Sequence, residues 1–156
     1  MRQNKRNLVI LIFLLLLCIG IGGCGRFKFP KESDFSLKAF VSNSNIKVGD
    51  ILKVSAVFKN NTSNDYICSS TASFSKSGLI HIYLFKNDEE EKILTGSASI
   101  VNLKRKQQIK EDTSFKLDKP GKYKVCVSSI FFISDSEKKD EHKYVIKADK
   151  IIIDCK

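Results

Sequence analysis

The chain has 156 residues, with 27 Lys and Arg against 17 Asp and Glu, and a net charge of +10. This length allows one domain with a buried core and excludes a second domain of ordinary size. After residue 6 the only arginines are Arg26 and Arg105, so nearly all the positive charge is lysine. Nucleic-acid readers favour the planar fork of arginine, and we therefore expect no nucleic-acid partner. Diffuse attraction to an anionic wall or lipid surface fits the charge better, and a lysine-rich genome composition would produce it without any function.

Residues 1–23 have the three parts of a secretory signal. A basic segment over residues 1–7 is followed by an uninterrupted apolar run over residues 8–19 and then by small residues. Such a segment is an export signal and does not belong to the fold. It resembles a bacterial lipoprotein signal, which has a branched aliphatic residue three positions before a cysteine and a small residue directly before it. The sequence Ile21-Gly22-Gly23-Cys24 meets both conditions.

The resemblance implies cleavage before Cys24 and attachment of lipid to its sulfur, which would anchor the protein in the membrane. Two or three acyl chains are enough for stable anchoring, at about 0.8 kcal/mol per buried methylene. The alternative is an uncleaved transmembrane anchor, because the uncharged run from Leu8 to Gly23 is only slightly shorter than a spanning helix. Both alternatives place the remainder at the extracytoplasmic face of the cell membrane. Residues 24–34 lack periodicity and are expected to form a short tether.

From Phe35 onward, apolar and polar residues alternate in segment after segment, and turn residues interrupt the chain at short intervals. This period of two predicts an all-β domain over residues 35–156. We expect seven to nine short strands, at residues 35–41, 52–58, 66–75, 79–85, 92–95, 97–103, 113–117, 123–133 and 144–154. A change of phase at Asp149 in the last of these predicts a β-bulge.

Two motifs carry a family resemblance. The segment from Phe115 to Val125 contains a Pro120-Gly121 turn ahead of a strand with Tyr123, and it looks like the end of bacterial immunoglobulin-like and fibronectin-like domains. The turn Val48-Gly49-Asp50 with the alternating strand after it resembles the second strand of cell-adhesion-type and proteinase-inhibitor-type sandwiches. The resemblance implies an immunoglobulin-like antiparallel β-sandwich.

Three thiols follow Cys24, namely Cys68, Cys126 and Cys155, and an odd number leaves at least one unpaired. If the last two strands form a hairpin centred near residue 138, Cys155 faces residue 121 and Cys126 faces residue 150. That separation is too large for a bridge between Cys126 and Cys155. A disulfide between Cys68 and Cys126 is the more open possibility.

The sequence offers little evidence of a catalytic or metal-binding site. His81 and His142 are the only histidines, and neither stands at zinc-ligand spacing from a cysteine or a carboxylate. No Gly-x-Ser-x-Gly elbow is present, and the acidic run 88–91 lacks the spaced ligands and turn glycine of a calcium loop. We therefore expect no enzyme activity, no metal and no cofactor.

Two features are candidates for a partner surface. The run from Ile130 to Ile133 puts Ile130 and Phe132 on the face that should be wet, so a bulge, a loop of the same domain or a partner must cover them. The basic sequence Lys104-Arg105-Lys106 is either an anion-contacting turn or a plain exposed loop.

These observations favour a lipid-anchored, non-enzymatic binding module for an envelope protein or an anionic wall polymer. An exported proteinase-inhibitor-like sandwich is the alternative, and a surface hydrolase or thiol enzyme has the least support.

Overall fold

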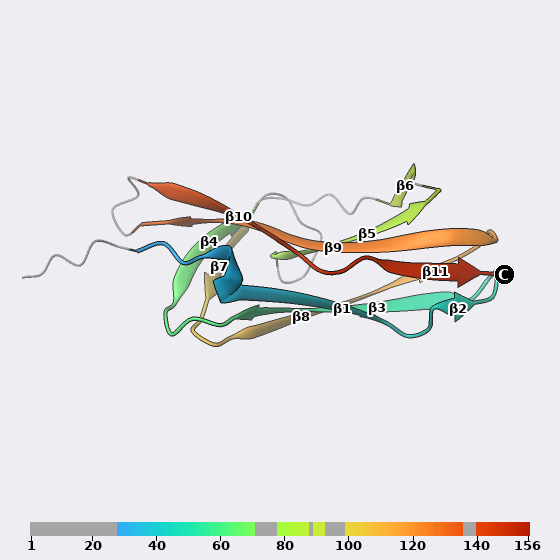
Figure 1. Ribbon diagram of the computed structural model, residues 1–156, viewed down its shortest axis with the longest axis horizontal. Coiled ribbons are helices and arrows are strands. Elements are labelled where there is room, and N and C mark those ends of the chain that lie inside the picture. The colour runs from blue at the N-terminus through green and yellow to red at the C-terminus, as the bar shows by residue number, and fades with distance from the viewer. Residues whose placement is uncertain (1–27, 71–77, 88, 93–98, 136–139) are drawn as a thin grey trace, which may run out of the picture.

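The structure is a computed structural model, and it describes residues 28–70, 78–87, 89–92, 99–135 and 140–156. These residues form two β-sheets packed face to face (Figure 1). The three-stranded sheet has the order β1-β3-β8, and the strands are β1 (Phe35–Val41), β3 (Ile51–Asn60) and β8 (Gln108–Lys116). The eight-stranded sheet contains β2 (Asn45–Ile46), β4 (Tyr66–Ser70), β5 (Ile80–Lys86), β6 (Glu89–Lys92), β7 (Ser99–Leu103), β9 (Gly121–Ser134), β10 (Glu141–Lys147) and β11 (Ile151–Cys155).

The long strand β9 is the centre of the eight-stranded sheet. On one edge it pairs with β11 and then with β10, and on the other with β5 and then with β4. All of these pairs are antiparallel, whereas the short pair between β2 and β11 is parallel. Because its side chains alternate along 14 residues, β9 contributes one row to the core and a second row to the outer face.

The core lies between the sheets and is built largely from aromatic rings near one end. Phe131 of β9 lies 5.2 Å from Phe35, 5.6 Å from Phe58 and 5.1 Å from Tyr144, measured between ring centroids. The first two contacts are edge-on and the third is stacked, as expected for rings that carry a negative face and a positive edge. This cluster joins strands from both sheets.

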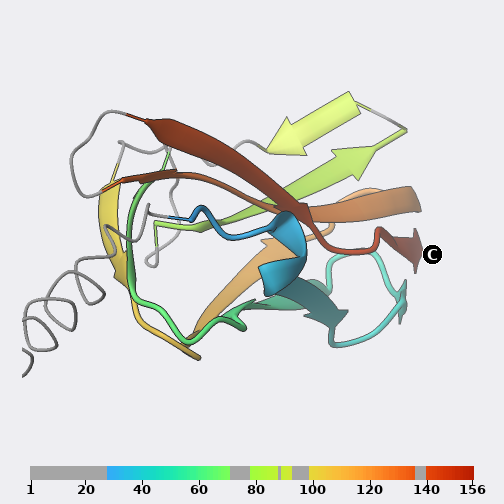
Figure 2. The ribbon, with the colours of Figure 1, turned by 60° about the vertical axis from the view of Figure 1, so that its left-hand side comes forward.

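The segment before β1 packs against the same end of the sandwich. The Tyr144 hydroxyl donates a hydrogen bond to the carbonyl of Pro30 over 2.8 Å, and the Phe29 ring lies 5.7 Å from the His142 ring. A 3₁₀ turn, η1 (Glu32–Asp34), then leads into β1 (Figure 2). Within the expected tether 24–34, residues 29–34 therefore lie on the domain, and Cys24 lies outside the described residues.

The corner before β9 follows from the Pro120-Gly121 turn. Gly121 has a φ of +139°, which L-residues with side chains rarely adopt. The turn brings the Tyr123 hydroxyl to within 2.8 Å of the Lys119 carbonyl, to which it donates a hydrogen bond. A tyrosine at the start of this strand that bonds back to the preceding turn is a hallmark of immunoglobulin-like sandwiches. The domain is an immunoglobulin-like β-sandwich, in which β1, β3 and β8 occupy the places of strands A, B and E.

Most expected strands are present, and the differences have physical reasons. The described residues form eleven strands because the short β2 is added and the last expected strand is divided into β10 and β11. No strand is expected between residues 103 and 113, but β8 already begins at Gln108. Among the described strands β8 is an edge strand that pairs with β3, and an edge strand can be polar on its solvent-facing side. The polar composition of its first residues therefore does not indicate a strand.

Substitution of Tyr123 by Phe tests the corner. The change keeps the ring in the core and removes the bond to the Lys119 carbonyl, so we expect a loss of about 1 kcal/mol in the free energy of unfolding. Urea denaturation followed by circular dichroism measures this loss. Tyr66→Phe is the matched control, because no hydrogen bond joins its hydroxyl to another described residue. An equal loss in both variants would contradict the role given to the corner.

Candidate functional site

The outer face of the eight-stranded sheet is less polar along β9 than a solvated face should be. Its outward row has polar residues at both ends, Lys122 and Lys124 at one and Ser134 at the other, and between them the half-buried Cys126, Ser128, Ile130 and Phe132. Ile130 lies opposite Val145, and Phe132 lies between Lys143 of β10 and Ser69 of β4. These neighbours cover the two apolar side chains in part.

The alternation of β9 continues without interruption through Ile130–Ile133. Phe131 and Ile133 are buried, and the pairing of β9 with β10 is continuous from Ser128 to Ser134. A bulge in β9, which was one explanation for the apolar run, is therefore wrong. The run is apolar on both faces, with its inward row in the core and its outward row beside β4 and β10.

The predicted bulge at Asp149 is confirmed. Ser128 of β9 pairs with Lys147, and Val125 pairs with Ile151. Two residues of β9 thus lie opposite three residues, 148–150, of the segment that pairs with it. The Ala148 N–H donates to the Val127 carbonyl over 3.0 Å. The extra residue changes the phase, so Lys147 and Lys150 both reach the outer face of the sheet.

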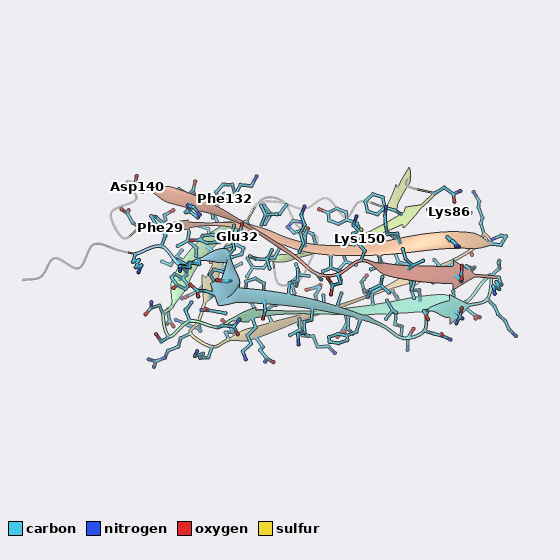
Figure 3. All side chains as sticks on the ribbon, in the orientation of Figure 1. Phe29, Glu32, Lys86, Phe132, Asp140 and Lys150 are labelled. Atoms are coloured by element: carbon cyan, nitrogen blue, oxygen red, sulfur yellow. The ribbon has the colours of Figure 1, made fainter. Side chains whose placement is uncertain are left out.

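A shallow groove of about 250 Å³ lies beside this bulge, and we call it the lysine–aromatic groove. Register places Tyr83 opposite Cys126 and Phe85 opposite Lys124 on one side of β9, while the bulge lies on the other side. The groove therefore has an aromatic wall from β5, a floor from β9 and a lysine wall from the β10–β11 junction. In Figure 3, Lys150 marks its position on the sheet. It is lined by Tyr83, Phe85, Cys126, Val127, Ser128, Lys147, Ala148 and Lys150.

Lysine side chains stand at the rim of the groove. Lys147 and Lys150 are exposed, and the Lys124 Nζ lies 5.3 Å from the centroid of the Phe85 ring, where the ring face attracts a cation. Asp149, between the two bulge lysines, is exposed and does not line the groove. The groove thus combines apolar walls with cations at its rim.

The three cysteines of the domain are free in this structure and differ in exposure. Cys68 faces Ile133 in the core, whereas Cys126 lies in the groove floor, seven positions along β9 from Ile133. Seven strand residues span roughly 23 Å, far beyond the reach of a disulfide, so the structure is incompatible with a Cys68–Cys126 bridge. Cys155 faces Gly121, as the expected hairpin register requires. Burial raises the pKa of Cys68 to about 12.

His81 lies next to the groove and stacks on Tyr83, with ring centroids 6.2 Å apart. Its Nε2 atom is buried and has no hydrogen-bond partner, and burial lowers the pKa of the imidazole below its ordinary value. Ser128, and not Cys126, is its partner in the register. No hydrogen bond links His81 to Cys126, so the described residues do not show the thiol–imidazole pairing that a thiol enzyme requires.

The basic turn Lys104-Arg105-Lys106 connects β7 to β8 and packs on the turn after β3. Lys104 Nζ lies 3.3 Å from an Asp65 carboxylate oxygen, and Lys106 Nζ donates to the Asn61 carbonyl. The Arg105 N–H donates to Asp65 over 2.7 Å, and this bond, with help from Lys104, lowers the pKa of Asp65. Two of the three cations thus contact neighbouring groups of the domain, which favours the plain exposed loop.

The structure does not bring the predicted partner residues into one site. Ile130 and Phe132 lie on the outer face of the eight-stranded sheet, whereas the basic turn lies beyond the end of β7. Sequence reasoning did not single out Tyr83, Phe85, Lys147 and Lys150. Two features of the sequence point to these residues: the alternating aromatic row in residues 81–85 and the lysines on both sides of Asp149.

Two kinds of feature are absent from the described part of the chain. No group of three or more His, Cys, Asp or Glu residues in it is arranged to hold a metal ion. No helix in the same residues is long and apolar enough to cross a membrane.

No protein-family model matches the sequence, and neither does any curated protein. Among solved structures, the chain is similar to the CARDB domain of a Pyrococcus furiosus protein in complex with di-metal ions, with a TM-score of 0.48 and 14% identity over 83% of this chain and 96% of that one. It is also similar to part of an alkylpurine DNA glycosylase from Pseudomonas fluorescens, with a TM-score of 0.41 and 9% identity over 74% of this chain and 30% of that one. A third similar structure is part of a β-glucosidase from Listeria innocua, with a TM-score of 0.38 and 16% identity over 73% of this chain and 16% of that one.

The different exposure of the thiols predicts selective labelling. In the folded protein we expect maleimide to modify Cys126 at least about tenfold faster than Cys68, because the Cys68 thiol is buried and its raised pKa keeps it protonated. Mass mapping of peptides after timed labelling locates the modified residue, and Cys126→Ser is the control that should lose the fast phase. Rapid labelling of Cys68 in the folded state would contradict the core position of β4.

The environment of His81 predicts a pH-dependent stability. A histidine whose pKa is lower in the folded state binds its proton more readily when unfolded, so the folded state loses stability as the pH falls below the ordinary value of 6.5. We expect the free energy of unfolding to fall between about pH 7 and about pH 5, and His81→Phe to reduce that slope. Urea titrations at several pH values measure it. A slope unchanged in His81→Phe would refute the assignment.

Proposed function

We propose that the protein is a lipoprotein, acylated at Cys24, that holds a non-catalytic binding domain at the extracytoplasmic face of the cell membrane. The sequence Ile21-Gly22-Gly23-Cys24 after a basic segment and an apolar run supports the anchor. The immunoglobulin-like sandwich supports a binding role in the weaker sense that this fold positions surfaces and loops for recognition and is used for many purposes.

The single observation that carries the binding role is the outer face of the eight-stranded sheet. A solvated sheet face normally alternates polar side chains with the core row, yet the outer row of β9 also carries Cys126, Ile130 and Phe132 and borders the lysine–aromatic groove. Concave apolar surfaces with a few polar groups at the rim are typical of ligand sites. The ligand side of the domain is therefore this face, and the partners that fit the location are envelope proteins or anionic wall polymers.

The position of the domain relative to the anchor agrees with this arrangement. Phe29 and Pro30 pack near the ends of β9 and β10, only a few residues after Cys24. The lysine–aromatic groove lies farther along the sheet, beside the β10–β11 junction. An anchored domain would thus keep the groove away from its attachment point.

Metabolic labelling with palmitate tests the anchor. We expect the label on the wild-type protein and its loss from Cys24→Ala, with the variant released from the membrane fraction because it lacks the acyl chains. Cys18→Ala is the matched control and should be labelled and membrane-bound like the wild type. Absence of label from the wild type, together with membrane retention of Cys24→Ala, would overturn the lipoprotein assignment in favour of an uncleaved anchor.

A further inference from the structure

We infer that the lysine–aromatic groove binds an acidic glycan, with a sugar ring against Tyr83 and Phe85 and its carboxylate or phosphate groups beside Lys147 and Lys150. The inference deepens the proposed function and rests on it for one point, because an extracytoplasmic position gives the groove access to envelope polymers. The binding chemistry itself follows from the side chains.

The shape of the groove sets the size of the occupant. The aromatic wall and the lysine wall stand on strands that flank β9 on opposite sides, so they are about 10 Å apart, twice the spacing of neighbouring strands. The volume of about 250 Å³ suits one or two rings of a ligand that continues along the open sheet face. A long polymer can therefore occupy the groove with a short segment.

The two walls differ in chemistry, and the occupant must match both. The rings of Tyr83 and Phe85 are 6.4 Å apart between centroids and contribute apolar ring surface to the groove lining, with the Lys124 Nζ over the Phe85 ring and His81 stacked on Tyr83. Lys147 and Lys150 offer ammonium groups, which bind carboxylate and phosphate as point charges. The described lining contains no Asp or Glu side chain that would repel an anion.

The paired backbone of the floor favours a glycan over an acidic peptide. A peptide usually gains affinity on a β-domain by adding a strand at a free sheet edge. Around the groove, β9 is paired with β5 on one side and with β10 and β11 on the other, so its backbone is already engaged. The ligand must be held by side chains, as a sugar is.

Cys126 provides a reporter inside the groove. Its thiol is half-buried in the floor, while Cys68 and Cys155 are buried in the core. An occupant that covers the floor should slow the labelling of Cys126 without affecting the other thiols. Reagent access thus measures occupancy at the groove itself.

The experiment uses the full chain in detergent with three probes: a short oligogalacturonate, an uncharged malto-oligosaccharide of the same length, and poly-glutamate. At saturation we expect oligogalacturonate to slow maleimide labelling of Cys126 about tenfold, and the two other probes to have a much smaller effect. The double variant K147Q/K150Q should raise the dissociation constant for oligogalacturonate about tenfold or more. Tyr83→Ala should also weaken it, with thermal unfolding checked in parallel.

The matched control is K38Q/K53Q, which removes the same charge from exposed positions on the three-stranded sheet. Equal weakening by both double variants would show diffuse attraction and overturn the inference. Equal protection by poly-glutamate, without any effect of Tyr83→Ala, would assign the groove to acidic peptides and also overturn it. Absence of protection by any probe would reject the groove as a ligand site, whereas palmitate labelling of Cys24 would still stand or fall separately.

Discussion

The pairing of β9 along both of its edges is the constraint on which the rest of the structure depends. Its inward row forms the core with strands of the opposite sheet, and its register fixes the places of β4, β5, β10 and β11. Because a shift of one residue would exchange the two rows, the buried row of β9 fixes the register of the neighbouring strands. The lysine–aromatic groove is a product of the same register, since its walls are set by which residues lie opposite Cys126 and Ser128.

Much of the fold could be predicted from the sequence because the pattern and the packing agree. The alternation in residues 35–41 and 52–58 corresponds to β1 and β3, and the Pro120-Gly121 turn with Tyr123 corresponds to the corner seen in the structure. The hairpin register that places Cys155 opposite residue 121 could also be worked out, because antiparallel pairing gives a constant sum of residue numbers until a bulge intervenes.

The candidate site was harder to predict, for physical reasons. Lys147 and Lys150 share a face only because a bulge changes the strand phase, and Tyr83 and Phe85 join them only through pairing with a strand some forty residues later. The polar start of β8 does not stand out in the sequence, because its apolar content is low and its pairing with β3 is not visible locally. The apolar composition of Ile130–Ile133 is visible in the sequence, but a bulge and an unbroken strand with two apolar rows look alike in one sequence.

The hydrogen bond from Tyr144 to the Pro30 carbonyl has a mechanical consequence. It pins the chain to the sandwich only six residues after Cys24, a stretch that spans at most about 22 Å when fully extended. A lipid on Cys24 would therefore keep the domain close to the bilayer and limit the orientations that the domain can adopt relative to it. Any ligand of the groove would have to come within roughly one domain length of the bilayer. The short linker would therefore restrict the groove to ligands attached to the membrane surface or present in the innermost layer of the envelope.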